Sequence, residues 1–459
     1  MTVTPVHEPV RRVLWLTFHY PPLATVGTHR NLGLTRWLPE HGWSPTVLTI
    51  HPRAGLSTDP ALLARVPAQV RVHRVAAPHL LEELARLRGR DPSGDPPLGA
   101  EGPAEMGRRS LAGHVKDLLT WPLHVPDVEW PWRWNAIRRG RALLREERPD
   151  CIVASSPPAT TLLAAARLSA WSGIPWVADL RDPWAGNPFT TIPYGWLERR
   201  NERLESRTLR SAACIVANTA RAAAELAARY PALADRIATV PNGFDPELTL
   251  AASAEAPAQA GPADVVTLLH AGSIYGRRRL DTLLRALASE PDARPLLHVT
   301  LLGAGSEALA AQVRELGIGD RIELRPPVAH REALAATRAA DIVLIAGVAG
   351  PTPESQVPAK LFEALALGKP VLALSKEGGA IEETLDDAGA TYWRADPESE
   401  TEIRSALAAI RAARRDGRDF ASMRARRLDA FALPDLARRF AEVLVRAASG
   451  GARARRSAR

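Results

Sequence analysis

Residues 354–373, ESQVPAKLFEALALGKPVLA, combine a helix start with polar and charged side chains. Proline is tolerated in the first turn of a helix and glycine often ends one, so Pro358 and Gly368 predict a short helix from about 358 to 367. The free N–H groups and the dipole of a helix N-terminus bind anions, so the amides of Gln356 and Val357, before Pro358, are expected to hold a diphosphate. Glu363 is placed to accept hydrogen bonds from a ribose diol.

A plainer interpretation of this helix stays open. Lys360 and Glu363 have the spacing of an exposed helical ion pair, which is common and contributes little.

A second polar group is predicted in the first half of the chain. The run PWVADLRDPW at 175–184 places Asp179, Arg181 and Asp182 just past the carboxyl end of a predicted strand, where α/β proteins bind ligands. These charges are expected to orient hydroxyl groups of a sugar or an acceptor. A structural ion pair between Asp and Arg is the alternative, and the two roles can coexist.

Strands and helices alternate around these residues. Short apolar runs predict strands in the first half at 12–17, 45–50, 151–154, 175–178, 214–217 and 237–240, and in the second half at 265–270, 297–302, 321–324, 341–345 and 370–374. Helices are expected from near Thr28 and at 160–171, 196–209 and 220–230. Such alternation predicts doubly wound parallel sheets.

The alternation divides into two halves, which fits the 459 residues of the chain. We predict a Rossmann-like domain at 1–246, a linker at 247–263, a second Rossmann-like domain at 264–430, and a C-terminal helix with a basic tail at 431–459. Two such α/β domains would face a central cleft. Residues 76–130 break the pattern and end in a Trp-rich stretch (121–134), predicted either to lie near the mouth of this cleft or to pack as core.

The segment at 354–373 resembles the donor-binding signature of family 4 glycosyltransferases, retaining enzymes of the GT-B fold, in which two glutamates are separated by seven residues and a Gly-x-Pro-Val strand follows. Glu363 matches the second glutamate and Gly368–Val371 matches the strand. Ser355 stands in place of the first, with Glu354 one position earlier. Either Glu354 fills that role through a shifted loop, or backbone amides and Ser355 contact the sugar.

The resemblance implies further site residues. Gly27 and Thr28 match a turn that approaches the donor phosphate and the acceptor, and Asn242 lies in a Pro-Asn-Gly-x-Asp turn near the domain junction. Relatives clamp the diphosphate with an arginine and a lysine, where this chain has Ser273 and Arg279, with Arg277 and Arg278 alongside. Guanidinium groups bind phosphate well, and which arginine does so is left open. Gly303 is expected beside the base or the phosphate, and the Asp-x-Arg-Asp-Pro-Trp run at 179–184 stands in place of a histidine that many relatives carry.

The resemblance and the residues together predict an enzyme that transfers a sugar from a nucleoside diphosphate sugar to a hydroxyl of a glycan, a lipid-linked or a small-molecule acceptor, with retention. Asp182, Glu354 and Glu363 are the predicted catalytic residues, and no cofactor is expected. The chain has no Asp-x-Asp triplet, so no metal site is predicted. The alternatives are a non-catalytic scaffold that binds sugar nucleotides, motivated by the displaced glutamate, and an epimerase or phosphorylase of the same fold.

Composition sets limits on location and partners. The net charge of +8 comes from arginines scattered along the chain, which argues against nucleic acid as a partner. The basic run at 451–459 is expected to be a disordered tail, with weak attraction to a membrane surface as its other use. Cys151 and Cys214 lie in apolar strands and suggest no disulfide, and no signal peptide or membrane span is recognised. A cytoplasmic protein, or one peripheral at the inner face of the membrane, is therefore expected.

Overall fold

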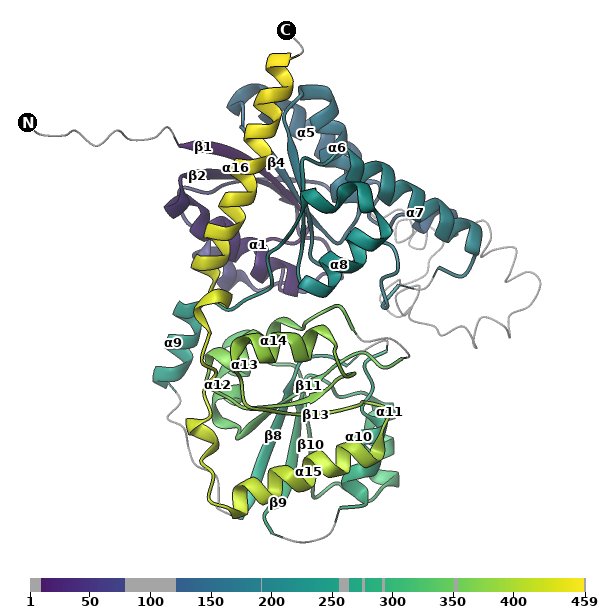
Figure 1. Cartoon of the computed structure of the whole chain (residues 1–459), viewed down its shortest axis with the longest axis vertical. Coiled ribbons are helices and arrows are strands. Elements are labelled where there is room, and N and C mark those ends of the chain that lie inside the picture. The colour runs from purple at the N-terminus through teal and green to yellow at the C-terminus, as the bar shows by residue number, and fades with distance from the viewer. Residues whose placement is uncertain are drawn as a thin grey trace, which may run out of the picture. The chain divides into compact units, whose positions relative to one another are not determined.

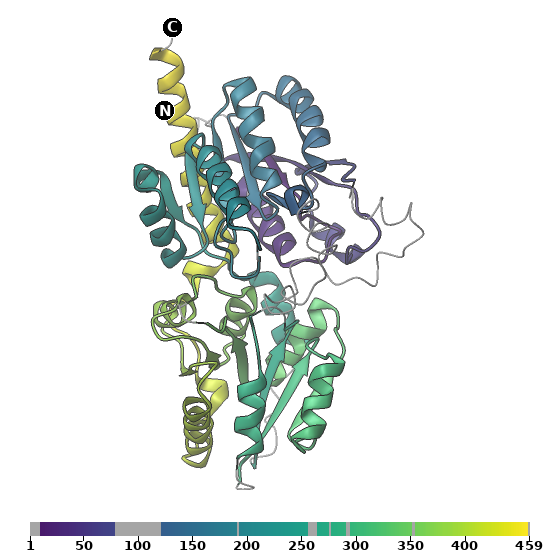
Figure 2. The ribbon, with the colours of Figure 1, turned by 90° about the vertical axis from the view of Figure 1, so that its right-hand side faces the viewer.

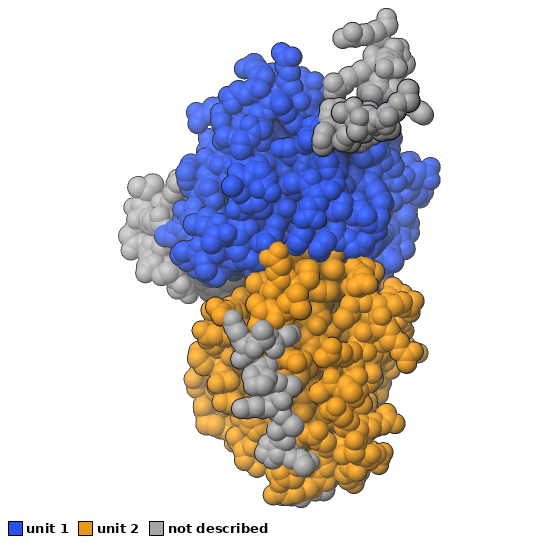
Figure 3. Space-filling view, turned by 90° about the vertical axis from the view of Figure 1, so that its left-hand side faces the viewer, with its two compact units in different colours: residues 1–241, 434–459 blue, residues 242–433 orange. Residues whose placement is uncertain are grey.

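The computed structural model describes residues 10–78, 121–190, 192–255, 264–274, 277–290, 294–350 and 354–457. The chain forms two compact units, of which unit 1 comprises residues 1–241 and 434–459, and unit 2 comprises residues 242–433 (Figure 3). This division differs from the predicted one because the C-terminal helix belongs to unit 1 and the boundary falls at Pro241.

Unit 1 contains a seven-stranded parallel sheet in the order β3-β2-β1-β4-β5-β6-β7 (Figure 1). Its strands are β1 (Arg11–Thr17), β2 (Trp43–Ile50), β3 (Arg71–Val75), β4 (Cys151–Ser156), β5 (Trp176–Leu180), β6 (Cys214–Ala217) and β7 (Ile237–Thr239). Its helices are α1 (Val26–Trp37), α5 (Trp132–Glu147), α6 (Thr160–Ser172), α7 (Gly195–Arg210), α8 (Ala220–Arg229) and α16 (Leu433–Ser457).

Unit 2 contains a six-stranded parallel sheet in the order β10-β9-β8-β11-β12-β13. Its strands are β8 (Val265–Ala271), β9 (Leu296–Leu302), β10 (Ile322–Arg325), β11 (Ile342–Ala346), β12 (Val371–Leu374) and β13 (Tyr392–Ala395). Its helices are α9 (Pro246–Glu255), α10 (Asp281–Ala288), α11 (Glu307–Glu315), α12 (His330–Ala339), α13 (Ala359–Ala366), α14 (Ala380–Ala388) and α15 (Glu400–Arg415).

Both sheets have the strand order of a doubly wound fold, with helices on both faces (Figure 2). The order reverses between β1 and β4 in unit 1 and between β8 and β11 in unit 2. Ligands of such sheets bind at the carboxyl ends of the strands at this reversal. The predicted class of two Rossmann-like parallel-sheet domains is therefore confirmed.

The central strands of unit 1 are buried in its core. β4 and β5 are buried along their whole length, as expected for strands covered by helices on both faces. The C-terminal helix supplies part of one cover, since the rings of Trp15 and Phe440 lie 5.0 Å apart (Figure 1). Cys151 and Cys214 are free and buried, as predicted.

Several predicted boundaries were wrong. Helix α9 occupies part of the predicted linker, of which residues 256–263 lie outside the described residues. Helix α16 continues through Ser457, so the backbone at 451–457 is helical and not a disordered tail. Strands β3 and β13 were not predicted, since each is a short, only partly buried edge strand.

The Trp-rich stretch packs mainly as core. Trp121 is 6% exposed and Trp132 is fully buried, whereas Trp134 is 61% exposed. The predicted excursion before it, residues 79–120, lies outside the described residues.

Candidate functional site

In unit 1 the predicted site residues gather where β1 gives way to α1. The helix begins at Val26, two residues before the predicted start, because the side chain of Thr25 caps it by accepting a hydrogen bond from the amide of Thr28. The hydroxyl of Thr25 also bonds His19 Nδ1 at 3.0 Å and the Thr28 hydroxyl at 3.0 Å. The side chain of Thr28 is fully buried in this network, so its predicted substrate contact stays a prediction.

Gly27 is needed because the guanidinium of Arg181 packs on its backbone. A Cβ at this position would collide with Arg181 Nη1 and would lie 3.0 Å from the Cβ of His19. Arg181 also pairs with Asp182 at 3.2 Å, and Asp182 remains 30% exposed. The structure thus groups Gly27 and Asp182 around Arg181 and adds His19, and the predicted contacts of these residues with a substrate stay a prediction.

His19 is a site residue that the sequence analysis did not single out. Burial and the adjacent Arg181 lower its pKa to about 3, so the imidazole is neutral at physiological pH. A neutral imidazole beside a guanidinium can accept or donate a hydrogen bond without changing the charge of the site. The sequence did contain a signal for this residue, since His19 follows the first predicted strand by two positions.

Asp179 differs from its neighbours in the same run. It lies inside β5, not past its end, and is fully buried. Its two carboxylate oxygens accept hydrogen bonds from Arg30 Nη2 at 2.7 Å and Arg30 Nε at 3.2 Å, and from Ser155 Oγ at 2.7 Å. This is the structural ion pair that was held as the alternative, formed with Arg30, and its predicted contact with substrate stays a prediction.

In unit 2 a glycine surface forms where β8 and β9 end. Gly272 has a φ of +115°, which side-chain-bearing residues rarely adopt, and a Cβ there would lie 2.7 Å from Lys360 Nζ. Gly303 lies beside it, since a Cβ on Gly303 would be 3.7 Å from the Cα of Gly272. Together the two glycines let partly exposed backbone approach the ammonium group of Lys360. Ser273, the next residue, is exposed.

The ammonium of Lys360 is held by a buried histidine. His270 Nδ1 donates to the carbonyl of Leu344 at 3.0 Å, so Nε2 is the acceptor that faces Lys360 Nζ at 3.2 Å. Burial and Lys360 lower the pKa of His270 to about 3, whereas burial and Arg278 lower the pKa of Lys360 to about 8. Lys360 and Arg278 therefore place two positive charges beside the glycine surface.

Arg278 and Arg279 differ in their surroundings, which bears on which of them would bind a diphosphate. Arg278 is close enough to lower the pKa values of both Lys360 and His270. Arg279 Nε instead pairs with Asp281 at 2.8 Å, and its side chain is 69% exposed. Arg278 is the better candidate for a ligand of the diphosphate.

Helix α13 begins next to the two cations, Lys360 and Arg278. Pro358 is its N-cap, one position outside the helix, and Lys360 is its second residue. The side chain of Gln356 is only 4% exposed, and neither its amide nitrogen nor its amide oxygen has a hydrogen-bond partner within the described part of the chain. Val357 is buried in the apolar core, so its side chain is not available to a ligand.

Glu363 and Glu354 occupy different environments. Glu363 is 24% exposed, and its Oε1 accepts a hydrogen bond from Nε2 of His330 at 2.8 Å, a partner that the sequence analysis missed. Glu354 is 6% exposed, and its carboxylate covers Gly379, where an added Cβ would lie 2.5 Å from Oε1. Gly379 caps α14, so the positive end of that helix faces the Glu354 carboxylate. Ser355 is partly exposed, and Asn242, the first residue of unit 2, is buried.

Two negative findings concern metals and membranes. Within the described residues, no three or more His, Cys, Asp and Glu side chains group as they would around a metal ion. None of the described helices combines the length and the apolar character that crossing a bilayer requires.

Two Rossmann-like units with polar groups at the strand ends define a fold of the GT-B class, and comparison with solved structures agrees. A glycosyltransferase from Rickettsia africae ESF-5 superposes with a TM-score of 0.60 at 12% identity, covering 95% of this chain and 97% of that one. Anabaena Alr3699/HepE, solved in complex with UDP and glucose, gives a TM-score of 0.61 at 17% identity, covering 95% of this chain and 99% of that one.

Family models name the two halves of the chain. Residues 92–248 match the model Glycosyltransferase Family 4, and residues 265–412 match the model Glycosyl transferases group 1. Each half of the chain is therefore similar to a glycosyltransferase domain. A D-inositol 3-phosphate glycosyltransferase from Streptomyces scabiei (strain 87.22) is 34% identical over 188 residues, which are 38% of this chain and 41% of that protein. The chain thus spans less than half the length of this curated relative.

Proposed function

We propose that this protein transfers a sugar from a nucleoside diphosphate sugar to an acceptor hydroxyl, with retention of configuration and without a metal ion, in the cytoplasm. The observation that carries the proposal is the group formed by Gly272, Gly303, Lys360 and Arg278 at the N-terminus of α13. It combines partly exposed backbone with two cations, as a diphosphate requires. The name of the Streptomyces relative supports an acceptor that carries a phosphate group.

The roles of the unit 2 residues follow from their environments. Negative charge develops on the diphosphate as it leaves the sugar. Lys360 and Arg278 would neutralise this charge. Glu363, held by His330, would bind the ribose diol. Gln356 would donate to and accept from the ligand, since a buried amide without partners among the described residues calls for such contacts.

The unit 1 residues would bind the acceptor. Arg181 and Asp182 are partly exposed, and Gly27 leaves space for the Arg181 guanidinium. Asp182 would accept a hydrogen bond from the acceptor hydroxyl, and Arg181 would hold an acceptor phosphate. That both groups of residues face one cleft stays a prediction.

The test begins with thermal unfolding of the purified protein in UDP, GDP and dTDP. A ligand selective for the folded state stabilises it by about 2.7 kcal/mol at a concentration about a hundredfold above its Kd. One of the three is expected to raise the Tm, and Lys360→Met is expected to abolish the effect. The matching nucleotide sugar is then incubated with candidate acceptors, and the anomeric configuration of the product is determined by NMR.

Three results would contradict the proposal in different ways. If no nucleotide changes the Tm, the proposed donor site is contradicted. Tight nucleotide binding without turnover of any nucleotide sugar would support a scaffold. An epimerised nucleotide sugar as the product would indicate an epimerase of the same fold.

A further inference from the structure

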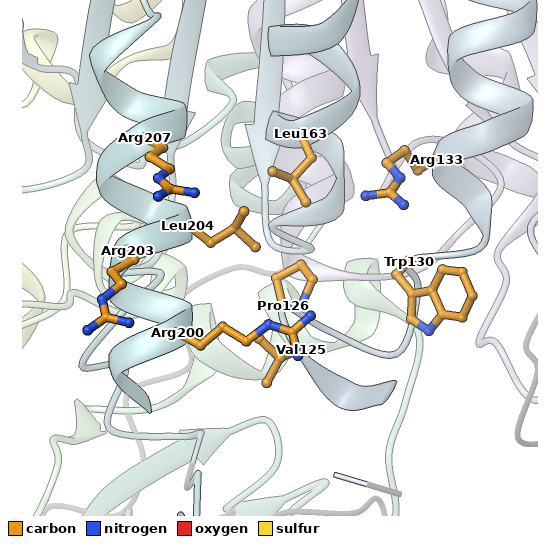
Figure 4. Close-up of a pocket in the computed structure, with 9 residues that line it drawn as sticks. All are labelled: Val125, Pro126, Trp130, Arg133, Leu163, Arg200, Arg203, Leu204 and Arg207. Carbon is orange, nitrogen blue, oxygen red and sulfur yellow. The ribbon is translucent and has the colours of Figure 1, made fainter. Parts of the chain in front are cut away.

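Unit 1 contains a pocket of about 550 Å³ on its helical face, formed by α6, α7 and the residues that lead into α5 (Figure 4). Four of its lining residues are arginines: Arg133, Arg200, Arg203 and Arg207. Among the residues that the structure describes, no acidic side chain lines it. None of the residues assigned above to the donor or the acceptor lines this pocket.

Helix α7 concentrates its positive charge on the side that lines the pocket. Arg200, Arg203 and Arg207, with Leu204, follow the i, i+3, i+4, i+7 spacing of one helix face. The helix carries its acidic residues on the opposite face, at Glu198, Glu202 and Glu205. Glu205 is occupied, since it accepts hydrogen bonds from the amide of Ala185 and the hydroxyl of Tyr230.

The pocket arginines have no ionic partner in the described part of the chain. Arg200, Arg203 and Arg207 make no ion pair there, and Arg133 packs over the ring of Trp134 at 4.6 Å. Like charges at these helical spacings repel one another, so the cluster is unfavourable unless an anion joins it.

Nearby carboxylates are already engaged elsewhere. Glu129 pairs with Arg53 at 2.6 Å. Asp127 accepts hydrogen bonds from the amide of Thr160 at 2.8 Å and from its hydroxyl at 2.7 Å, so it caps α6. Neither carboxylate neutralises the pocket arginines.

The floor of the pocket is apolar. Val125, Pro126, Leu163 and Leu204 line it, and the ring of Trp130 forms one side. Figure 4 shows the guanidinium groups of Arg133 and Arg207 pointing toward one another from the two sides of Leu163, and that of Arg200 reaching toward Pro126 and Val125. A ligand here would meet guanidinium groups with one part and apolar side chains with another.

We propose that this pocket binds a phosphate-bearing ligand with an apolar portion. Guanidinium groups bind phosphate oxygens in a bidentate manner. One guanidinium is enough for a carboxylate, so three or four of them favour a phosphate as the ligand. The apolar floor would bury a hydrocarbon portion adjoining the phosphate. This inference does not depend on the proposed transfer reaction, because binding here needs no nucleotide sugar.

In the experiment, the full chain is titrated with dihexanoyl phosphatidic acid below its micelle concentration, and calorimetry measures the Kd. Arg200→Ala/Arg207→Ala removes two pocket arginines, and Arg199→Ala/Arg210→Ala removes two exposed arginines of the same helix that do not line the pocket. The pocket variant is expected to raise Kd about tenfold or more, because hydrogen bonds to charged groups are lost. The control variant is expected to keep the Kd of the unaltered protein. A Tm equal to that of the unaltered protein would confirm for each variant that the fold is intact.

Two further arms distinguish the source of the phosphate. Inorganic phosphate is expected to bind more weakly than dihexanoyl phosphatidic acid, and equal affinity would overturn the role of the apolar floor. Vesicles of phosphatidylcholine with and without phosphatidic acid test a bilayer. Binding to acidic vesicles but not to the soluble lipid would overturn the pocket, as would equal Kd values for the two double variants.

Discussion

The ammonium group of Lys360 lies 3.2 Å from the acceptor nitrogen of His270, a residue whose other ring nitrogen is fixed by the carbonyl of Leu344. This pairing connects the end of β8 with the first turn of α13. It directs a cation onto Gly272 and leaves the imidazole neutral, since the pKa of His270 is lowered to about 3. The pair therefore contributes one positive charge, and that charge depends on Lys360 alone.

The affinity for a nucleoside diphosphate is expected to fall as the pH rises above about 8. Burial lowers the pKa of Lys360 to about 8, so the free protein loses this proton well below the usual range of lysine. A bound diphosphate favours the protonated form, so the contribution of Lys360 to binding is complete well below pH 8 and is lost as the pH rises above it. Calorimetry with UDP or the preferred nucleotide between pH 6.5 and about 9.5 measures this dependence.

A second lysine serves as the control for this titration. Burial also lowers the pKa of Lys369 to about 8, but Lys369 follows the end of α13 rather than its start. Lys369→Met is expected to keep the pH dependence, whereas Lys360→Met binds weakly at every pH. A pH dependence that survives in Lys360→Met would assign the titration to another group.

Gly272→Ala is expected to weaken nucleotide binding more than it destabilises the fold. The added Cβ would lie 2.7 Å from Lys360 Nζ and would displace the ammonium, and the φ of +115° adds backbone strain of about 1–3 kcal/mol. Gly317→Ala is the matched control, because Gly317 has a φ of +65° with nothing within 4 Å of its added Cβ. If the two variants bind the nucleotide equally well, the glycine surface is not part of the site.

Glu363→Ala is expected to remove the preference for a ribonucleotide. If Glu363 accepts a hydrogen bond from the ribose, the unaltered protein binds UDP about tenfold or more tightly than 2′-deoxy-UDP, and the variant binds both alike. Thermal shifts at matched concentrations provide the measurement. His330→Ala, which removes the 2.8 Å hydrogen bond, is expected to reduce the preference partly, because His330 only positions the carboxylate.

The matched control for this variant is Glu315→Ala, which removes an exposed carboxylate of the same unit and should leave the preference intact. Loss of affinity for both nucleotides in equal proportion would place Glu363 away from the ribose.

Most of the fold could be predicted from the sequence because its strands are buried on both faces. Apolar runs such as 151–154 and 341–345 stand out against the Arg- and Ala-rich helices. The structure extends the first by two residues and shifts the second by one. The edge strands β3 and β13 could not be predicted in this way, since RVHRV and YWRA carry charged residues and are only partly buried. The place of α16 in unit 1 depends on tertiary packing, such as Phe440 on Trp15.

The site could be predicted only where glycine, proline or a charge follows a strand. Gly27 was predicted from its place after a strand, and Lys360 and Glu363 from the helix that Pro358 opens. The structure gives each a close contact with another polar side chain, and their contacts with a ligand stay a prediction. The partners of these residues, such as His270 and His330, were not found, because their proximity depends on pairing between strands and helices far apart in the sequence.

Asp179→Asn is expected to lower the free energy of unfolding by about 3–5 kcal/mol, because it leaves the buried Arg30 without its countercharge. Both side chains are almost fully buried and form two hydrogen bonds with each other. Urea unfolding monitored by tryptophan fluorescence measures the change. Glu307→Gln, in an ion pair whose side chains are 65% and 87% exposed, is the control, with an expected loss of at most about 1 kcal/mol. An Asp179→Asn protein that keeps its stability but loses acceptor binding would instead make Asp179 a ligand of the acceptor, and the ion pair with Arg30 would be incidental.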